Sequence, residues 1–226
     1  MFKKISIFFG ALFFCFFINS LMAIDDASTL DQGKFELENN LNFVINPDKS
    51  KDTLINTSLK HGITEKLDFC INIPYEIQPK QGFNDAEIGI KFALLKEKIY
   101  LPNISLSFSS ELGSSDYTLI GILSQQFGKI TLHINAGYTT NKDISIMYLN
   151  PISLELFLSD AIEIPISKKI TLIGEIVSEN NLKNLGAFLS GNLKISDTVN
   201  FVLEFGFQSK NNNIKKQITS GLIYEF

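Results

Sequence analysis

The chain has two histidines, His61 and His133, and these are the residues to examine first for enzymatic or metal chemistry. A zinc site needs three or four ligands at a recognisable spacing, and no cluster of His, Cys and Asp accompanies either histidine. A hydrolase would pair a histidine with an activated serine, but nothing distinguishes one serine near His133 from the many others. A glycine-rich phosphate loop is also absent. We therefore predict neither an enzyme nor a cofactor or metal site.

Charged side chains give a more informative pattern, because they recur on the polar phase of segments that alternate apolar and polar residues. If these segments cross a membrane, the charges face away from lipid, since a lipid-facing lysine costs about 2–4 kcal/mol near the midplane. They then line an interior that is either packed shut by paired polar groups or open as an acid-lined conduit favouring cations and neutral solutes. Arginine, which is common in anion constrictions, does not occur. The lumen-lining candidates are Glu36, Glu38, Asp68, Glu87, Lys91, Glu155, Glu175, Lys194, Glu204 and Glu225.

The elements that must position these charges are strands, because apolar residues recur at every second position. Phe201, Leu203, Phe205 and Phe207, for example, share one face of their segment, and a period of two predicts a strand with two different faces. Lengths of roughly 10–12 residues exceed the ~5–6 of globular sheets and suit a bilayer crossing. Strands are predicted at 33–45, 53–62, 66–77, 85–95, 103–112, 117–127, 130–140, 152–164, 169–178, 184–195, 199–209 and 215–226.

The connections between these strands alternate between tight turns and longer polar loops, which is typical of outer-membrane barrels. The predicted fold class is therefore all-β, an antiparallel up-and-down transmembrane β-barrel of about twelve strands. Such barrels have an even number of strands, so ten or fourteen strands are also possible. Aromatic residues near strand ends, among them Tyr75, Tyr138 and Tyr224, fit the interfacial girdles of such a barrel. A secreted soluble β-sandwich is the alternative that alternation alone also describes. We expect the loops 78–84 and 141–151 to narrow the lumen.

The first 23 residues have the pattern of a secretory signal peptide. Lys3 and Lys4 precede an almost wholly apolar stretch, and a cleavage site follows Ala23; an uncleaved anchor helix is the alternative. We therefore divide the chain into a cleaved leader (1–23), an N-terminal periplasmic segment (24–32) and the barrel (33–226). The acidic balance, with a net charge of −4 before cleavage, does not suit nucleic-acid binding.

The last six residues alternate as the other strands do and finish on an aromatic residue. Leu222, Tyr224 and Phe226 are predicted to face lipid, while Glu225 faces inward. An aromatic residue at the end of a final strand is similar to the signal that the barrel-assembly machinery recognises. We expect this last strand to pair with the first, because a closed barrel has no free edge.

Several segments together resemble the outer-membrane transporter family of the meta-pathway of phenol degradation. These are HGITEKLDF (61–69) continuing to Pro74-Tyr75, FNDAEIGIKF (83–92), Leu101-Pro102 at the start of a strand, and LHINAGY (132–138). The chain departs from the family's pattern at 84 and 86, where a second acidic residue and a glycine are frequent. The resemblance spans about 30–226 and implies an outer-membrane barrel of about twelve strands that passes small, often aromatic or apolar, compounds.

The sequence thus predicts an outer-membrane barrel for passive uptake of small molecules through an acid-rich lumen. Its expected partners are outer-membrane lipid, the barrel-assembly machinery and a small-molecule solute. We expect no nucleic-acid partner, and the sequence does not determine the oligomeric state. Both barrel termini are expected in the periplasm. A non-transporting structural or adhesion barrel with a plugged lumen is the competing interpretation.

Overall fold

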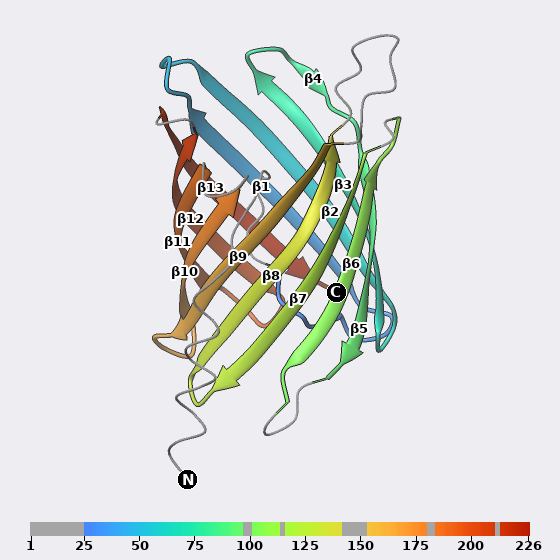
Figure 1. Ribbon diagram of the computed structural model, residues 1–226. Helices are drawn as coiled ribbons and strands as arrows, with labels where there is room; N and C mark the ends of the chain where they lie inside the picture. Colours follow the sequence, from blue (N-terminus) through green and yellow to red (C-terminus); the bar gives the residue numbers. More distant parts are fainter. Residues whose placement is uncertain (1–24, 97–100, 114–115, 142–152, 180–183, 211–212) are drawn as a thin grey trace, which may run out of the picture.

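The computed structural model describes residues 25–96, 101–113, 116–141, 153–179, 184–210 and 213–226, and their strands form one antiparallel sheet (Figure 1). No helix long and apolar enough to cross a membrane occurs among them. One strand, β4, has only two residues. The strands are β1 Phe35–Ile45, β2 Lys51–Thr64, β3 Leu67–Gln78, β4 Gly82–Phe83, β5 Glu87–Leu95, β6 Asn103–Glu111, β7 Tyr117–Phe127, β8 Ile130–Asn141, β9 Ser153–Pro165, β10 Ile170–Glu179, β11 Asn184–Lys194, β12 Val199–Lys210 and β13 Asn213–Glu225.

The twelve long strands close into a barrel. Each pairs with its neighbours in the chain, and the last strand, β13, pairs with the first, β1, which also pairs with β2. Phe35 and Phe226 complete the seam by exchanging two backbone hydrogen bonds of 2.9 Å each. The predicted fold class and strand number are confirmed, and the two-sheet sandwich is excluded because the described strands form a single closed sheet.

The short turns and the two ends of the sheet lie at one end of the barrel. The turn between β7 and β8 has only two residues, and its Gly128 has a φ of 67°, a conformation that glycine adopts without steric cost. Since β1 begins and β13 ends at this same end, the even number of strands brings the seam residues together there. One element was not predicted: β4 adds to the edge of β3 through Tyr75 and Glu76, within the expected loop 78–84.

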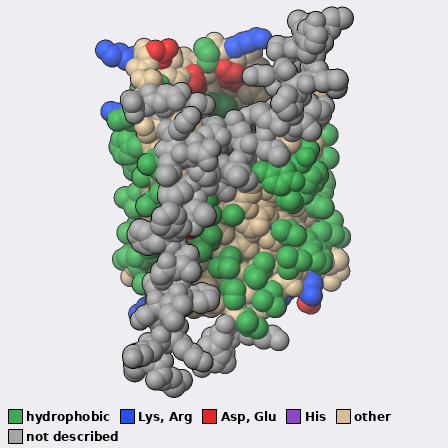
Figure 2. Space-filling model, viewed as in Figure 1, with side chains coloured by type: hydrophobic (Ala, Val, Ile, Leu, Met, Phe, Trp, Pro, Cys, Tyr) green, Lys and Arg blue, Asp and Glu red, His purple; other side chains and the backbone are tan. Residues whose placement is uncertain are grey.

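The two faces of the wall differ as the alternation predicts. The outer face carries large apolar side chains, among them Ile176, Leu189 and Phe207, which are 63%, 58% and 56% exposed. Figure 2 shows apolar side chains over much of the visible wall that is not grey, with charged side chains gathered near its two ends. The inner face carries buried polar side chains instead, such as Asn42 and Ser105. The barrel therefore has the polarity of a transmembrane wall, with hydrocarbon outside and polar groups inside.

Candidate functional site

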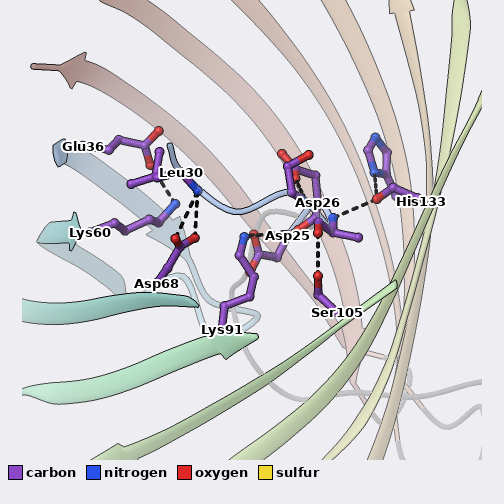
Figure 3. Close-up of polar contacts among 12 residues, drawn as sticks. Asp25, Asp26, Leu30, Glu36, Lys60, Asp68, Lys91, Ser105 and His133 are labelled. Carbon is purple, nitrogen blue, oxygen red and sulfur yellow. Dashed lines mark hydrogen bonds and ion pairs between the residues drawn. The ribbon is translucent and has the colours of Figure 1, made fainter. Parts of the chain in front are cut away.

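The lumen contains a short length of the chain itself. Residues 25–32, which precede β1, lie inside the barrel between the strands, and Figure 3 shows Asp25, Asp26 and Leu30 facing side chains of the wall. We call residues 25–32 the lumen segment. The sequence prediction had set these residues apart from the barrel, because they lack the alternation of the strands. The contacts described below place residues 25–32 inside the barrel.

The first anchor of the lumen segment is the Lys91 side chain of β5. Its ammonium group lies 3.0 Å from Asp25 Oδ1 and donates to the Asp26 carbonyl at 3.2 Å. Burial disfavours the charged form of Asp25, but Lys91 and Lys60 outweigh this effect and hold the pKa of Asp25 below its ordinary value. Lys60 of β2 in turn forms an ion pair of 2.8 Å with Glu36. The lumen segment thus enters a chain of alternating charges.

The second anchor fixes both polar backbone groups of Ala27. Its N–H donates to Ser124 Oγ at 2.9 Å, and its carbonyl accepts a hydrogen bond from the Ser105 hydroxyl. The Ala27 side chain is 1% exposed and packs in a small apolar cluster with Ile120, Ile122 and Val177, which Phe188 borders. These four wall residues face the lumen, although most inward positions are polar.

The third anchor lies where the lumen segment approaches β1 and β2. The Leu30 N–H donates to both carboxylate oxygens of Asp68 at 3.1 Å, and the Thr29 hydroxyl donates to the Glu65 carbonyl at 2.9 Å. Gly62 of β2 lies directly against the backbone here, because a Cβ at that position would meet the Asp31 and Leu30 carbonyl oxygens at less than ordinary contact distance. Only a glycine leaves room for the lumen segment to pass.

A serine, a histidine and a glutamate also come together in the lumen. Ser124 Oγ lies 2.9 Å from His133 Nδ1, and His133 Nε2 lies 3.4 Å from Glu163 Oε2. This is the order of a hydrolytic triad, but Ser124 accepts the Ala27 N–H. In a triad the serine bonds Nε2 and the acid bonds Nδ1, whereas here the two ring nitrogens are exchanged. In this structure Ser124 anchors the lumen segment. His133 is 5% exposed, which fits this role as a buried hydrogen-bonding residue.

The predicted lumen residues fall into several environments. Asp68 and Lys91 hold the lumen segment, and Glu36 and Glu38 both face Lys60, at 2.8 and 3.9 Å. Glu175 and Glu204 are buried on the far wall, and Glu204 accepts a hydrogen bond of 3.5 Å from Thr219. Glu87 lies opposite Glu111 on β6. The side chain of Glu155 lies outside the described residues.

Two of the predicted lumen residues lie at the short-turn end and are exposed. Lys194 is paired with Asp197 of the following turn at 2.8 Å, and this hydrogen bond lowers the pKa of Asp197. Glu225 is exposed at the end of β13. The three residues of the predicted assembly signal, Leu222, Tyr224 and Phe226, are 50%, 45% and 51% exposed on the outer face.

Sequence reasoning missed the lumen segment and the polar residues that hold it. Ser105 and Ser124 are two among many serines, and only the fold brings both to Ala27. Of the loops expected to narrow the lumen, 78–84 contains β4, and 141–151 lies outside the described residues apart from its first residue. The described residues contain no group of three His, Cys, Asp or Glu side chains able to hold a metal ion.

Comparison with known proteins places the fold but not a family. No family model matches the chain, and no curated protein matches it. An outer membrane channel from Pseudomonas putida F1 matches with a TM-score of 0.64 at 9% identity, over 91% of this chain and 100% of that chain. The chain has the fold of outer-membrane channels. The NanC porin (TM-score 0.63, 9% identity, 83% of this chain, 98% of that chain) and the KdgM porin in complex with disordered oligogalacturonate (0.60, 12%, 84% and 99%) are also similar. These identities show a shared fold alone, and the resemblance to the phenol-pathway family is not confirmed.

Proposed function

We propose that the protein is a passive channel of the outer membrane, whose lumen the segment 25–32 narrows. The supporting observation is how the lumen is filled. The lumen segment is held by hydrogen bonds and an ion pair to polar wall residues, and among the described residues the apolar contact to it is a small cluster around Ala27. A barrel that served only as a rigid envelope protein would be expected to fill its interior with a continuous packed core.

Space for a solute remains beside the lumen segment. A cavity of about 180 Å³ is lined by Ala27, Ser28 and Thr29 on one side and by Ala93, Lys96 and Asn103 of the wall on the other. Polar and charged linings of this kind allow water and small polar solutes to exchange. Passage of aromatic or otherwise apolar compounds belongs to the same proposal, because Ile122 and Val177, which are 1% and 4% exposed beneath Ala27, become accessible to a solute when the lumen segment moves.

The charge of the lumen supports a preference for cations and neutral solutes. Inward positions of the described strands carry more carboxylates than lysines, and the lysines Lys60 and Lys91 are already paired with Glu36 and Asp25. A carboxylate-rich passage lowers the energy of a cation and raises that of an anion. Export through the leader 1–23 and a periplasmic position for both ends of the sheet belong to the same proposal.

Purified protein in planar bilayers tests this function. We expect discrete conductance steps in the full chain, larger steps in a variant lacking residues 25–31, and liposome swelling with small sugars or aromatic acids. A bilayer that stays silent with both proteins would refute a channel. It would favour the competing function, a non-transporting envelope barrel, for which the tight anchoring of the lumen segment is the specific supporting observation.

A further inference from the structure

One carboxyl group lies on the outer, lipid-facing side of the barrel. In β9 the side chains of Ser159 and Ala161 are buried in the interior, so Asp160 between them points outward. Its neighbours across the sheet are Ile134 of β8 and Ile176 of β10, which are both outward-facing apolar residues. Asp160 therefore interrupts the apolar wall with an ionisable group, and intramembrane ionisable residues mark functional positions by default.

The depth of Asp160 keeps it away from water and from lipid headgroups. It lies near the middle of β9, which runs from Ser153 to Pro165. A strand tilted by about 40° rises roughly 2.5 Å per residue along the membrane normal, which places Asp160 roughly 12 Å from Pro165. That is about half of the ~25 Å apolar band of such barrels. Within the part of the chain that the structure describes, the Asp160 carboxyl group has no hydrogen bond or ion pair, while its backbone pairs with β8 and β10.

The wall around Asp160 is shaped for close contact. The nearby outward residues Ala136, Gly174 and Ala187 are small and exposed, while Ile176 and Ile162 project beside them, 63% and 47% exposed. In membranes, small residues at an interface let two backbones approach closely, which provides the packing that lipid cannot.

We propose that this face binds a second copy of the same chain, about a two-fold axis along the membrane normal that brings the two Asp160 side chains together. A rotation about that axis leaves depth unchanged, so each Asp160 meets the other at its own level in the membrane. A carboxylic acid is both a hydrogen-bond donor and an acceptor, and two of them satisfy each other without any further group. A different protein would have to supply a donor at this depth independently. Two-fold dimers are also the most common closed assemblies.

A second way to satisfy Asp160 with the same chain predicts a different assembly. On the opposite wall, Thr57 donates to Asn39 Oδ1 at 2.9 Å, which leaves the Asn39 amide hydrogens directed away from Thr57. Contact of Asp160 with Asn39 of another copy would join opposite sides of successive barrels and build an open row. The two arrangements bring different residue pairs together, so cross-linking separates them.

Disulfide cross-linking in isolated outer membranes tests the proposal. In a chain whose Cys15 and Cys70 are replaced by serine, D160C alone is expected to give a covalent dimer under mild oxidation, at least about tenfold more than the control I73C. Ile73 is outward-facing and 38% exposed on β3, across the barrel. The same membranes should contain D160C and I73C at equal levels in heat-modifiable form, which shows that both barrels are assembled.

Two results would overturn the dimer. One is D160C cross-linking no better than I73C, which would mean that the two Asp160 side chains do not meet. The other is cross-linking that requires D160C and N39C on separate chains, which would indicate the open row. As an independent measurement, native mass spectrometry of detergent-solubilised protein is expected to show a dimer for the natural chain and a monomer for Asp160→Leu. A natural chain that is monomeric at every detergent concentration tested would also contradict the proposal.

Discussion

Replacing Gly62 by alanine tests whether the lumen segment restricts the channel. An alanine Cβ at this position would lie 3.0 Å from the Leu30 carbonyl oxygen and nearer still to that of Asp31. Gly62 is not among the glycines with positive φ, so alanine fits its backbone conformation. The backbone hydrogen bonds of Gly62 to Gly33 and Lys34, 2.7 and 3.0 Å, involve no side chain. The substitution therefore acts on the position of the segment and changes no charge.

The size of the effect follows from the anchor next to Gly62. Ordinary van der Waals contact begins at 3.4 Å, so the segment must move from β2 by roughly 1 Å. That shift takes the Leu30 N–H from 3.1 Å to about 4 Å from the Asp68 carboxylate, beyond hydrogen-bonding distance. A hydrogen bond to a charged group contributes about 1.5–3 kcal/mol. Loss of about 2 kcal/mol raises the population with the segment released by roughly 30-fold.

Single-channel recording in planar bilayers measures this population. We expect Gly62→Ala to show frequent steps of the large conductance found in the variant lacking residues 25–31, with the small conductance of the natural chain between them. Gly191→Ala is the matched control, because its added Cβ would meet only Leu172 Cδ2, at an ordinary contact distance of 3.7 Å. It should behave as the natural chain does.

Two outcomes would refute this reasoning. If deletion of residues 25–31 leaves the conductance unchanged, the segment does not narrow the passage at all. If deletion enlarges the conductance but Gly62→Ala matches the natural chain, the segment is held without the contact at Gly62, and the energy assigned to the Asp68 anchor is wrong.

Three further predictions concern charge, assembly and pH. Glu87→Gln with Glu175→Gln should lower the K⁺-to-Cl⁻ permeability ratio by about two- to fivefold, because a cation passing a carboxylate in water gains up to about 1 kcal/mol. An unchanged ratio in reversal-potential measurements would contradict the acidic conduit. Deleting Phe226 removes two backbone hydrogen bonds of the seam, about 2 kcal/mol, and should reduce heat-modifiable protein in the membrane fraction; normal levels would exclude it as an assembly signal. The lowered pKa of Asp25 means that its ion pair with Lys91 persists above the ordinary carboxyl value and is lost as the pH falls below it. Asp25→Asn should therefore raise the conductance at pH 7, and its difference from the natural chain should disappear only below about pH 4; a difference that disappears between pH 7 and pH 5 would contradict the lowered pKa of Asp25.

Much of the barrel could be predicted from the sequence, because strand structure and the two faces of a wall are local properties. Side chains alternate across a strand with a period of two, so the apolar phase identifies lipid-facing residues such as Leu222 and Phe205 directly. A slip by one residue would turn every polar side chain into lipid, which fixes the register between neighbours. The same alternation contained the signal of Asp160, which shares the phase of Leu158 and Ile162.

The sequence by itself determined the all-β class, the twelve long strands, the short-turn end and the outward position of the final aromatic residues. Only the tertiary structure decided what occupies the lumen. The lumen segment has no periodicity of its own, and its partners Asp68, Lys91 and Ser124 lie 38 to 97 residues away in sequence. Closure of the sheet brings these distant strands together around one lumen. The backbone N–H and C=O groups of a segment inside the lumen need hydrogen-bond partners, and closure decides which inward side chains lie near enough to provide them.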